Sequence, residues 1–205
     1  MVKRKGLLLV VSGPSGAGKG TICKAILDQN DQIKLSVSAT TRKLRNGEVH
    51  GVNYFFLEKE EFTSMIEKGE FLEYAQIYDN FYGTPKSAIM ETLDNGQDVI
   101  LEIEMQGARQ VKEVYPEGIF VFVLPPSLEE LKNRIVGRGT ETEEEIEKRF
   151  SCAFKEINQI DDYDYFIVNE DVEKSVRELE AIISSEKNKV TRYKNNIIEK
   201  FKEEL

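Results

Sequence analysis

The first residues with an evident chemical use are closely spaced glycines followed by a lysine. They form the stretch Gly13-Pro14-Ser15-Gly16-Ala17-Gly18-Lys19-Gly20-Thr21. Glycine carries no Cβ, so successive backbone N–H groups can turn toward one anion. A lysine at the end of such a loop places a positive charge at the outer phosphates of a nucleotide. The stretch is therefore predicted to bind nucleotide phosphates.

The segments on either side of this loop have the order that a phosphate-binding loop requires. Residues 7–11 are a short apolar run typical of a buried strand, and Ile22, Ala25 and Ile26 recur at helical spacing. A strand, a glycine loop and a helix N-terminus thus follow one another. A glycine-rich turn without a ligand is the competing interpretation, and these flanks disfavour it.

The loop departs from the usual motif at one position. Ser or Thr normally follows the lysine, and its hydroxyl contacts Mg²⁺. Here that residue is Gly20, and Thr21 comes one position later. The order Gly-Lys-Gly-Thr resembles the loop of adenylate-kinase-like nucleoside monophosphate kinases. In those enzymes the metal ion is held mainly by substrate phosphates and water. Position 20 therefore offers no hydroxyl to Mg²⁺.

Two carboxylates follow an apolar strand farther along the chain. The strand is expected over residues 98–104, and two-residue spacing puts Glu102 and Glu104 on one side of it, near its carboxyl end. Ligands of open α/β sheets bind at that end of the strands. A carboxylate there can hold hydrated Mg²⁺ and orient the loop lysine. A solvated strand end is the alternative.

Arginines gather in two further segments. Arg42 and Arg45 lie three residues apart in a polar stretch, where such a cluster is more often solvated surface than a site. Arg134 and Arg138 lie four apart beside two glycines that could act as hinges, and Arg149 follows in the next helix. Phosphoryl transfer needs charge neutralisation and exclusion of water, so the second segment is a candidate lid.

The elements that position these residues alternate between strands and helices. This order predicts an α/β fold with a P-loop NTPase-type parallel sheet flanked by helices. Residues 34–85 differ, because short strand-like runs predict a small, mostly β insertion there. Within it, residues 35–38 are expected to form a strand, and residues 80–84 a turn before a helix behind Pro85.

The expected boundaries follow from this division. The core comprises residues 5–33 and 86–184, and the lid spans about residues 134–148. A long C-terminal helix begins near Val172, and residues 185–205 are its extension. Apolar spacing predicts buried positions on the helices around the lid at Leu128, Leu131, Ile135, Ile146, Phe150, Ala153, Phe154 and Ile157.

Composition narrows the function classes. The chain has 205 residues, 32% of them charged and 40% hydrophobic, with a net charge of −9. A general attraction to nucleic acid or to an anionic membrane is therefore not expected. No apolar stretch approaches the roughly 18 residues that cross a bilayer. Cys23 and Cys152 suit reduced, buried thiols, so a cytoplasmic enzyme is predicted.

Motifs along nearly the whole chain resemble the guanylate kinases. They occur in family order over about residues 5–184: Gly13–Lys19, Ser36–Arg42, Arg45–Gly51, Tyr54–Phe56, Phe71–Glu73, Tyr82–Thr84, Met105–Gly107, Leu124–Ser127, Gly137–Gly139 and Ile167–Asn169. The resemblance implies phosphorylation of GMP by ATP with Mg²⁺, as part of purine nucleotide metabolism.

The resemblance also implies roles for individual residues. The insertion would be the GMP-binding region, with the phosphate held by Arg42, Arg45, Tyr54 and Tyr82, and the nucleotide otherwise contacted by Ser38, Glu73, Thr84 and Glu104. Guanine presents N1–H and N2–H₂ as adjacent donors, which a carboxylate accepts together. Adenine lacks that pair, so the carboxylate of Glu73 would select against it.

On the donor side, residues 13–21 would wrap the ATP phosphates, and Asn169 would lie near adenine. Lys19, Arg134, Arg138 and Arg149 would stabilise charge during transfer, and Glu102 would hold Mg²⁺ through water. The family typically has Asp where this chain has Glu102 and Glu104. The extra methylene moves each carboxylate by roughly 1.5 Å, about one bond length.

Two other functions are weighed against the kinase. One is a guanylate-kinase-like module that binds protein partners without turnover, but such modules usually have a damaged phosphate loop, and Lys19 is present here. The other is a kinase for a different small acceptor, against which Glu73 and the two arginines argue. The sequence leaves open a monomer or a homodimer, and GMP or dGMP as the preferred acceptor.

Overall fold

A five-stranded parallel sheet forms the core of the molecule. The structure is a computed structural model that describes residues 4–136 and 143–202, with side chains from residue 150 onward in the second range. The strand order is β2-β7-β1-β8-β9, and every neighbouring pair is parallel. The strands are β1 (Leu8–Ser12), β2 (Ile33–Leu35), β7 (Asp98–Glu102), β8 (Ile119–Leu124) and β9 (Tyr165–Val168).

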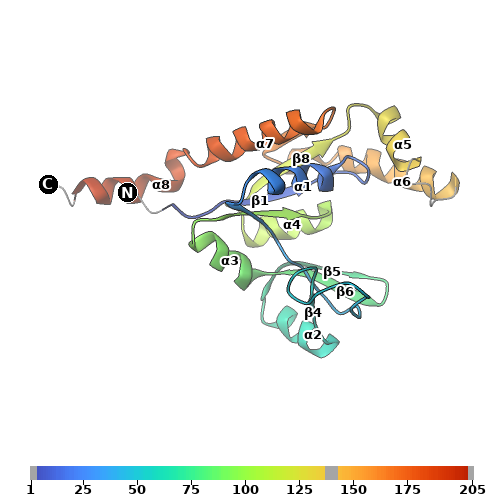
Figure 1. The fold of residues 1–205 in the computed structure, drawn as a ribbon, viewed down its shortest axis with the longest axis horizontal. Coiled ribbons are helices and arrows are strands. Elements are labelled where there is room, and N and C mark those ends of the chain that lie inside the picture. Colours follow the sequence, from blue (N-terminus) through green and yellow to red (C-terminus); the bar gives the residue numbers. More distant parts are fainter. Residues whose placement is uncertain (1–3, 137–142, 203–205) are drawn as a thin grey trace.

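Helices cover both faces of this sheet (Figure 1). Alternate residues of β1 point to opposite faces, so Leu9 and Val11 pack in one core and Leu8 and Val10 in the other. The first core is covered by α1 (Lys19–Gln29) and α7 (Val172–Glu186), and the second by α3 (Lys86–Asp94) and α4 (Met105–Val114). The predicted parallel sheet flanked by helices is confirmed.

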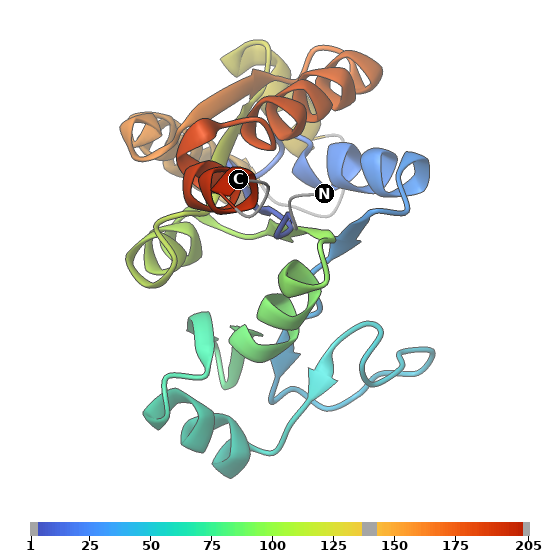
Figure 2. The ribbon, with the colours of Figure 1, turned by 90° about the vertical axis from the view of Figure 1, so that its left-hand side faces the viewer.

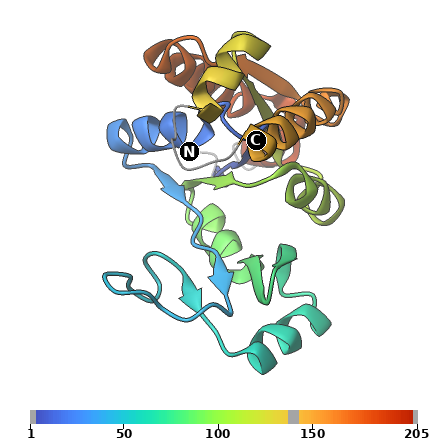
Figure 3. The ribbon, with the colours of Figure 1, turned by 90° about the vertical axis from the view of Figure 1, so that its right-hand side faces the viewer.

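A second sheet forms a small lobe, which we define as residues 39–85. Its order is β4-β3-β6-β5, and α2 (Lys59–Glu67) covers it through a core of Ala39, Phe62 and Phe71. The strands are β3 (Ala39–Thr40), β4 (Phe55–Phe56), β5 (Phe71–Ile77) and β6 (Asn80–Pro85). Figures 2 and 3 show this lobe on one side of the core, with α3 leading back from it.

Residues 80–84 form strand β6, so the predicted turn there is wrong. The turn lies just before it, at Tyr78, whose φ is +54°. The glycine in the segment, Gly83, serves close packing: a Cβ there would lie 2.9 Å from the carbonyl oxygen of Glu73 and 3.0 Å from side-chain atoms of Phe71 and Tyr74. Glycine in a strand often marks such an approach.

The strand predicted over residues 35–38 is also displaced. Strand β2 covers Ile33–Leu35 and pairs with β7 in the core sheet, so the predicted boundary between residues 33 and 34 falls inside a core strand. The Ser36 N–H still donates to the carbonyl oxygen of Ile100, at 2.9 Å. Pairing with a buried neighbour, rather than local alternation, fixed the position of this strand.

Two helices pack against each other beside the glycine loop. They are α5 (Leu128–Val136) and α6 (Glu143–Ile157), and Leu131, Ile135 and Ala153 pack between them as predicted. Leu128 and Phe154 were also predicted to be buried, but they are 39% and 52% exposed. Cys152 is exposed as well, whereas Cys23 is buried as expected. Fewer residues of these two helices are buried than their apolar spacing predicts.

The C-terminal helix is interrupted once. Helix α7 ends at Glu186, and α8 (Val190–Lys202) continues at an offset and projects from the core (Figure 1). The buried Glu186 carboxylate accepts hydrogen bonds from Lys189 and Arg192, which pull the start of α8 back toward the sheet. Among the described residues, no helix is both long and apolar enough to cross a membrane.

Candidate active site

The glycine loop joins β1 to α1 in a conformation that its glycines make possible. Gly13, Gly16 and Gly18 have φ values of +140°, +91° and +92°, which favour glycine. A Cβ at Gly13 would lie 2.3 Å from the carbonyl oxygen of Val123, and one at Gly18 would lie 2.2 Å from Nδ2 of Asn169. The loop thus depends on its neighbours in β8 and after β9.

Lys19 turns back over this loop. Its ammonium donates to the carbonyl oxygens of Gly13 at 2.6 Å and Pro14 at 3.2 Å. Burial lowers the pKa of the ammonium, and the neighbouring Glu102 carboxylate opposes that shift. A cation is therefore held at the mouth of the loop by backbone oxygens rather than by a carboxylate partner.

Asn169 and Arg134 brace the loop from outside. The Asn169 amide donates to the carbonyl oxygen of Ala17 at 2.8 Å, and its side chain is buried. The Arg134 guanidinium donates to the carbonyl oxygen of Asn169 at 3.1 Å and pairs with Glu130 at 2.8 Å. The structure thus brings both predicted residues to the loop, and Asn169 contacts the loop backbone directly.

A pocket of about 480 Å³ opens in front of the loop. Its described walls come from the loop, the first turn of α1, the end of β7 with the two residues after it, and Glu156 of α6, with no residue of the small lobe. Glu102 is the last residue of β7, and Glu104 precedes α4 as its N-cap. The strand is therefore shorter than predicted, yet both carboxylates line the same pocket.

The pocket also suits a divalent cation bound with a nucleotide. Mg²⁺ prefers oxygen ligands and is usually held by one or two carboxylates together with water and substrate phosphates. Glu102 offers such a carboxylate: its side chain is reached by solvent, although partial desolvation by the walls raises its pKa. Among the described residues, no group of three or more His, Cys, Asp or Glu could hold a metal alone.

Glu156 of α6 reaches the same pocket and was missed by the sequence reasoning. Its carboxylate lines the pocket together with Ser15, Lys19 and Glu104, and the charges of Lys19 and Glu104 act on it. Burial raises its pKa, and Lys19 opposes that shift. Glu156 lies three residues after the buried Ala153, so a carboxylate on the inward face of α6 was the available signal.

The small lobe gathers a second set of predicted residues around Arg42. Its guanidinium forms two hydrogen bonds with Glu48, at 2.7 and 3.0 Å, and lies 5.5 Å from the centre of the Tyr54 ring. The Tyr54 and Tyr82 rings meet edge to face at 6.1 Å. Arg42, Tyr54 and Tyr82 are therefore brought together, as a common phosphate contact requires.

Glu48 organises this group and was not among the predicted residues. Besides Arg42, it accepts the backbone N–H of Arg45 at 2.8 Å. The hydrogen bonds from Arg42, followed by the one from Arg45, lower the pKa of Glu48 to about 2. The side chain of Arg45 is exposed at the same turn, while Ser38 lies half-buried just before β3.

Glu73 and Thr84 face each other across β5 and β6. The Thr84 hydroxyl donates to Oε1 of Glu73 at 2.5 Å, and both residues are buried. Burial raises the pKa of the Glu73 carboxyl, and the bond from Thr84 opposes the shift. The other oxygen, Oε2, faces Gly107 in the first turn of α4, 3.0 Å from where a Cβ would stand. Helix α4 thus carries Glu104 at the loop pocket and Gly107 at Glu73.

Two predicted residues have no described side chain. Arg138 lies outside the described residues, and Arg149 lies in the part of α6 for which only the backbone is described. Their expected contact with phosphates therefore stays a prediction.

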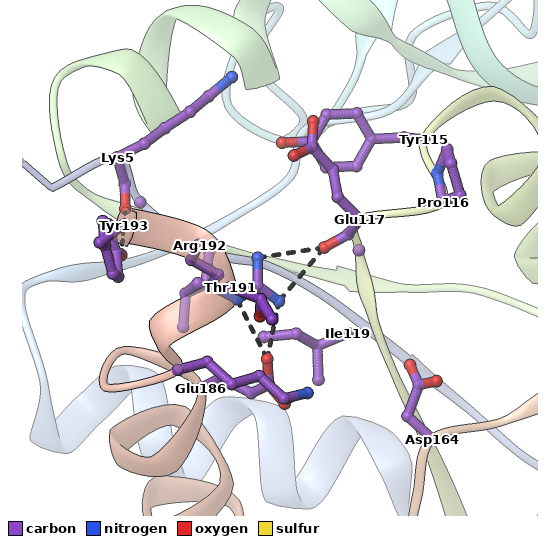
Figure 4. A pocket seen from close by; sticks show the side chains of 14 residues that line it. Lys5, Tyr115, Pro116, Glu117, Ile119, Asp164, Glu186, Thr191, Arg192 and Tyr193 are labelled. Carbon is purple, nitrogen blue, oxygen red and sulfur yellow. Dashed lines mark hydrogen bonds and ion pairs between the residues drawn. The ribbon is translucent and has the colours of Figure 1, made fainter. Parts of the chain in front are cut away.

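A second pocket, of about 430 Å³, lies between the start of α8 and the amino-terminal ends of β1, β8 and β9 (Figure 4). Lys189 and Arg192, which line it, both pair with Glu186. Burial opposes ionisation of Glu186, but hydrogen bonds from Lys189, Tyr165 and Arg192 outweigh it and lower its pKa to about 2. Arg192 also donates to the carbonyl oxygen of Glu117 at 3.3 Å. These pairs attach α8 to the core.

Comparisons with known proteins agree with this arrangement. The family model described as guanylate kinase matches residues 5–186. A guanylate kinase of Clostridioides difficile strain 630 is 80% identical over the full length of both chains. One from Caldanaerobacter subterraneus is 56% identical over 95% of this chain and 94% of its own. The crystal structure of guanylate kinase from Anaplasma phagocytophilum matches with a TM-score of 0.71 and 35% identity, over 94% of this chain and 92% of that one.

Proposed function

The chain belongs to the guanylate kinase family, and on that premise we propose that this kinase transfers the γ-phosphate of ATP to GMP, giving ADP and GDP. The observation that carries the proposal is the buried Glu73 carboxylate, held by Thr84 in a lobe separate from the phosphate loop. Such a carboxylate fits the paired N1–H and N2–H₂ donors of guanine.

The acceptor would bind in the small lobe, which takes the place of the predicted 34–85 insertion. Arg42, Arg45, Tyr54 and Tyr82 would hold its phosphate, and the clustering of Arg42 with the two tyrosines supports this role. Ser38, Glu73 and Thr84 would contact the base. Glu104 would lie between acceptor and donor, since it precedes the helix whose Gly107 faces Glu73.

The donor would bind at the glycine loop. Residues 13–21 would surround the ATP phosphates with N–H groups, and Lys19 would leave the carbonyl oxygens of Gly13 and Pro14 to meet the phosphates. Arg134, Arg138 and Arg149 would stabilise negative charge from the side of the lid, about residues 134–148. Asn169 would lie near adenine while it supports the loop.

The transfer would be direct and in line. An oxygen of the GMP phosphate attacks the γ-phosphorus of ATP as the bond to the β-phosphate oxygen breaks, so no side chain needs to act as a nucleophile. Catalysis then consists of positioning and electrostatic stabilisation. When bound, Mg²⁺ would neutralise phosphate charge, and Glu102 would hold it through water or directly.

Further proposals concern the setting of the reaction. We extend the acceptors to dGMP, because none of the proposed contacts involves the ribose 2′-hydroxyl. Residues 5–184 would form the kinase domain and residues 185–205 its extension, in a monomer or a homodimer. A cytoplasmic role in purine nucleotide metabolism and GMP recycling fits two cysteines that are both free.

An ADP-release assay with Mg-ATP tests the proposal against GMP, dGMP, AMP, CMP and UMP. Rapid turnover is expected with the two guanine nucleotides alone. Turnover with AMP at a similar rate would overturn the selectivity assigned to Glu73. Binding of GMP without any turnover would instead favour a non-catalytic module of the same fold.

A further inference from the structure

Gly20 has no conformational reason to be glycine. It is the second residue of α1, and unlike Gly13, Gly16 and Gly18 it does not have a positive φ. The freedom of glycine to adopt a positive φ is therefore not used at this position. In loops of this type, the position after the lysine usually carries a hydroxyl that contacts Mg²⁺. The presence of glycine at position 20 therefore needs another explanation.

The space in front of Gly20 is taken by the carboxylate of Glu102. A Cβ built on Gly20 would lie 3.3 Å from Oε1, 3.5 Å from Oε2 and 3.8 Å from Cδ of Glu102. These are the three nearest heavy atoms, and all belong to one carboxyl group. A side chain at position 20 would thus press on the carboxylate of Glu102, which would have to shift by a few tenths of an ångström.

The reach of Glu102 depends on its length. Its Cα pairs with Val11 in the sheet, so the side chain starts from β7 and crosses in front of the loop to the first turn of α1. An aspartate at this position would end about one bond length, ~1.5 Å, short of that point. The combination of glycine at 20 with glutamate at 102 therefore puts a carboxylate where the ordinary loop has a hydroxyl.

We propose that Gly20 and Glu102 form a matched pair, in which the Glu102 carboxylate supplies to the nucleotide-bound Mg²⁺ the oxygen that a hydroxyl at position 20 supplies in the ordinary loop. This inference rests on the proposed donor site and sharpens it, because the oxygen comes from strand β7 instead of helix α1. It predicts that the two positions cannot be changed independently.

A double-mutant cycle tests the pairing with G20S, E102D and the G20S/E102D double variant. The readout is the rise in unfolding temperature caused by ADP, titrated with Mg²⁺ in the absence of GMP, so that no turnover is needed. The half-saturating Mg²⁺ concentration should rise about tenfold in E102D. G20S should also raise it, because the new side chain crowds the carboxylate.

The double variant shows whether the effects of the two substitutions are coupled. With a hydroxyl at 20 and the shorter acid at 102, the half-saturating concentration should return to within about threefold of wild type, far below the product of the two single effects. If the effects of G20S and E102D simply multiply, the pairing is wrong. Unfolding temperatures without ligand show whether each variant is folded.

E104D is the matched control. Glu104 lines the same pocket, but none of its atoms is among the three nearest to a Cβ at position 20. G20S should not rescue it. Equal rescue of E102D and E104D would overturn the proposal in favour of a general effect of serine in the loop. A wild-type protein that binds Mg-ADP but does not phosphorylate GMP would contradict the proposed function. The Mg²⁺ titrations of the double-mutant cycle could still be interpreted in that case.

Discussion

The two halves of the site hold their charged groups in different ways. In the donor half, the backbone positions the charged group. Three glycines with positive φ shape the loop, and the Lys19 ammonium donates hydrogen bonds to carbonyl oxygens. In the acceptor half, side chains hold one another, with Arg42 on Glu48 and Glu73 on Thr84. A nucleotide phosphate therefore meets a lysine that is held only by carbonyl oxygens at the loop, but an arginine that is already paired with a carboxylate in the small lobe.

The supporting cores differ as well. The loop is attached to a five-stranded sheet with a hydrophobic core on each face. The small lobe has a core of three buried residues, with partly buried neighbours around it. Because few buried contacts allow local opening at low free energy, we expect the acceptor half to be the more easily deformed. Substitutions should therefore act mainly on turnover at the loop and mainly on GMP binding in the lobe.

The largest effect is expected from Lys19→Ala. Removing the cation at the mouth of the loop should lower kcat by about 10²–10³-fold, as the loss of one preorganised electrostatic group commonly does. The fold should persist, because the ammonium contacts only loop carbonyl oxygens. Lys24→Ala, on an exposed turn of the same helix, is the control and should keep its rate. Wild-type turnover in Lys19→Ala would remove the loop from the donor role.

Glu73→Gln should act on the other half. The amide replaces one acceptor oxygen with a donor, so the KM for GMP should rise by between about 10- and 100-fold, the range for a lost hydrogen bond to a charged group. The KM for ATP should change far less. Glu70→Gln, an exposed position just before β5, provides the matched control. An unchanged KM for GMP would contradict the base-reading role.

Gly107→Ala gives a smaller effect of the same kind. A methyl group there would stand 3.0 Å from Oε2 of Glu73, so the carboxylate must shift by a few tenths of an ångström. The KM for GMP should rise by less than about tenfold. Alanine favours the helix by about 1 kcal/mol over glycine, so the unfolding temperature should not fall much. Strong unfolding without a change in KM would mean that Gly107 serves packing only.

The sequence predicted the donor half better than the acceptor half, for a physical reason. Glycine spacing and a following helix are local signals, so the loop and Lys19 could be located before any packing was known. Gly83 was misread as a turn residue, because its close approach to β5 depends on a strand partner. Glu48 was missed for a similar reason: its role arises from a pairing with Arg42 that only the folded turn creates.

Glu156 shows the same limit in the donor half. Its place beside Ser15 depends on how α6 packs against the loop, and a helix pattern gives only the inward face. The division into two lobes was predictable from the change in pattern after the first helix. The membership of β2 in the core sheet was not, because residues 33–35 have no signal that distinguishes pairing with β7 from pairing within the small lobe.

The smallest effects separate two carboxylates within the acceptor half. Glu48 has a folded-state pKa lowered to about 2, so its contribution to stability is present above the unfolded value of 4.5 and is lost as pH falls toward 2. Burial raises the pKa of Glu73, so the folded state takes up that proton more readily, and the cost of its charge is relieved as pH falls. Glu48→Gln should therefore lower the unfolding temperature at pH 7, and Glu73→Gln should raise it. Both differences should shrink as pH falls to 4 and below in a series of thermal unfolding curves. Shifts of the same sign for the two variants at pH 7 would show that the lobe does not distinguish a paired carboxylate from a desolvated one.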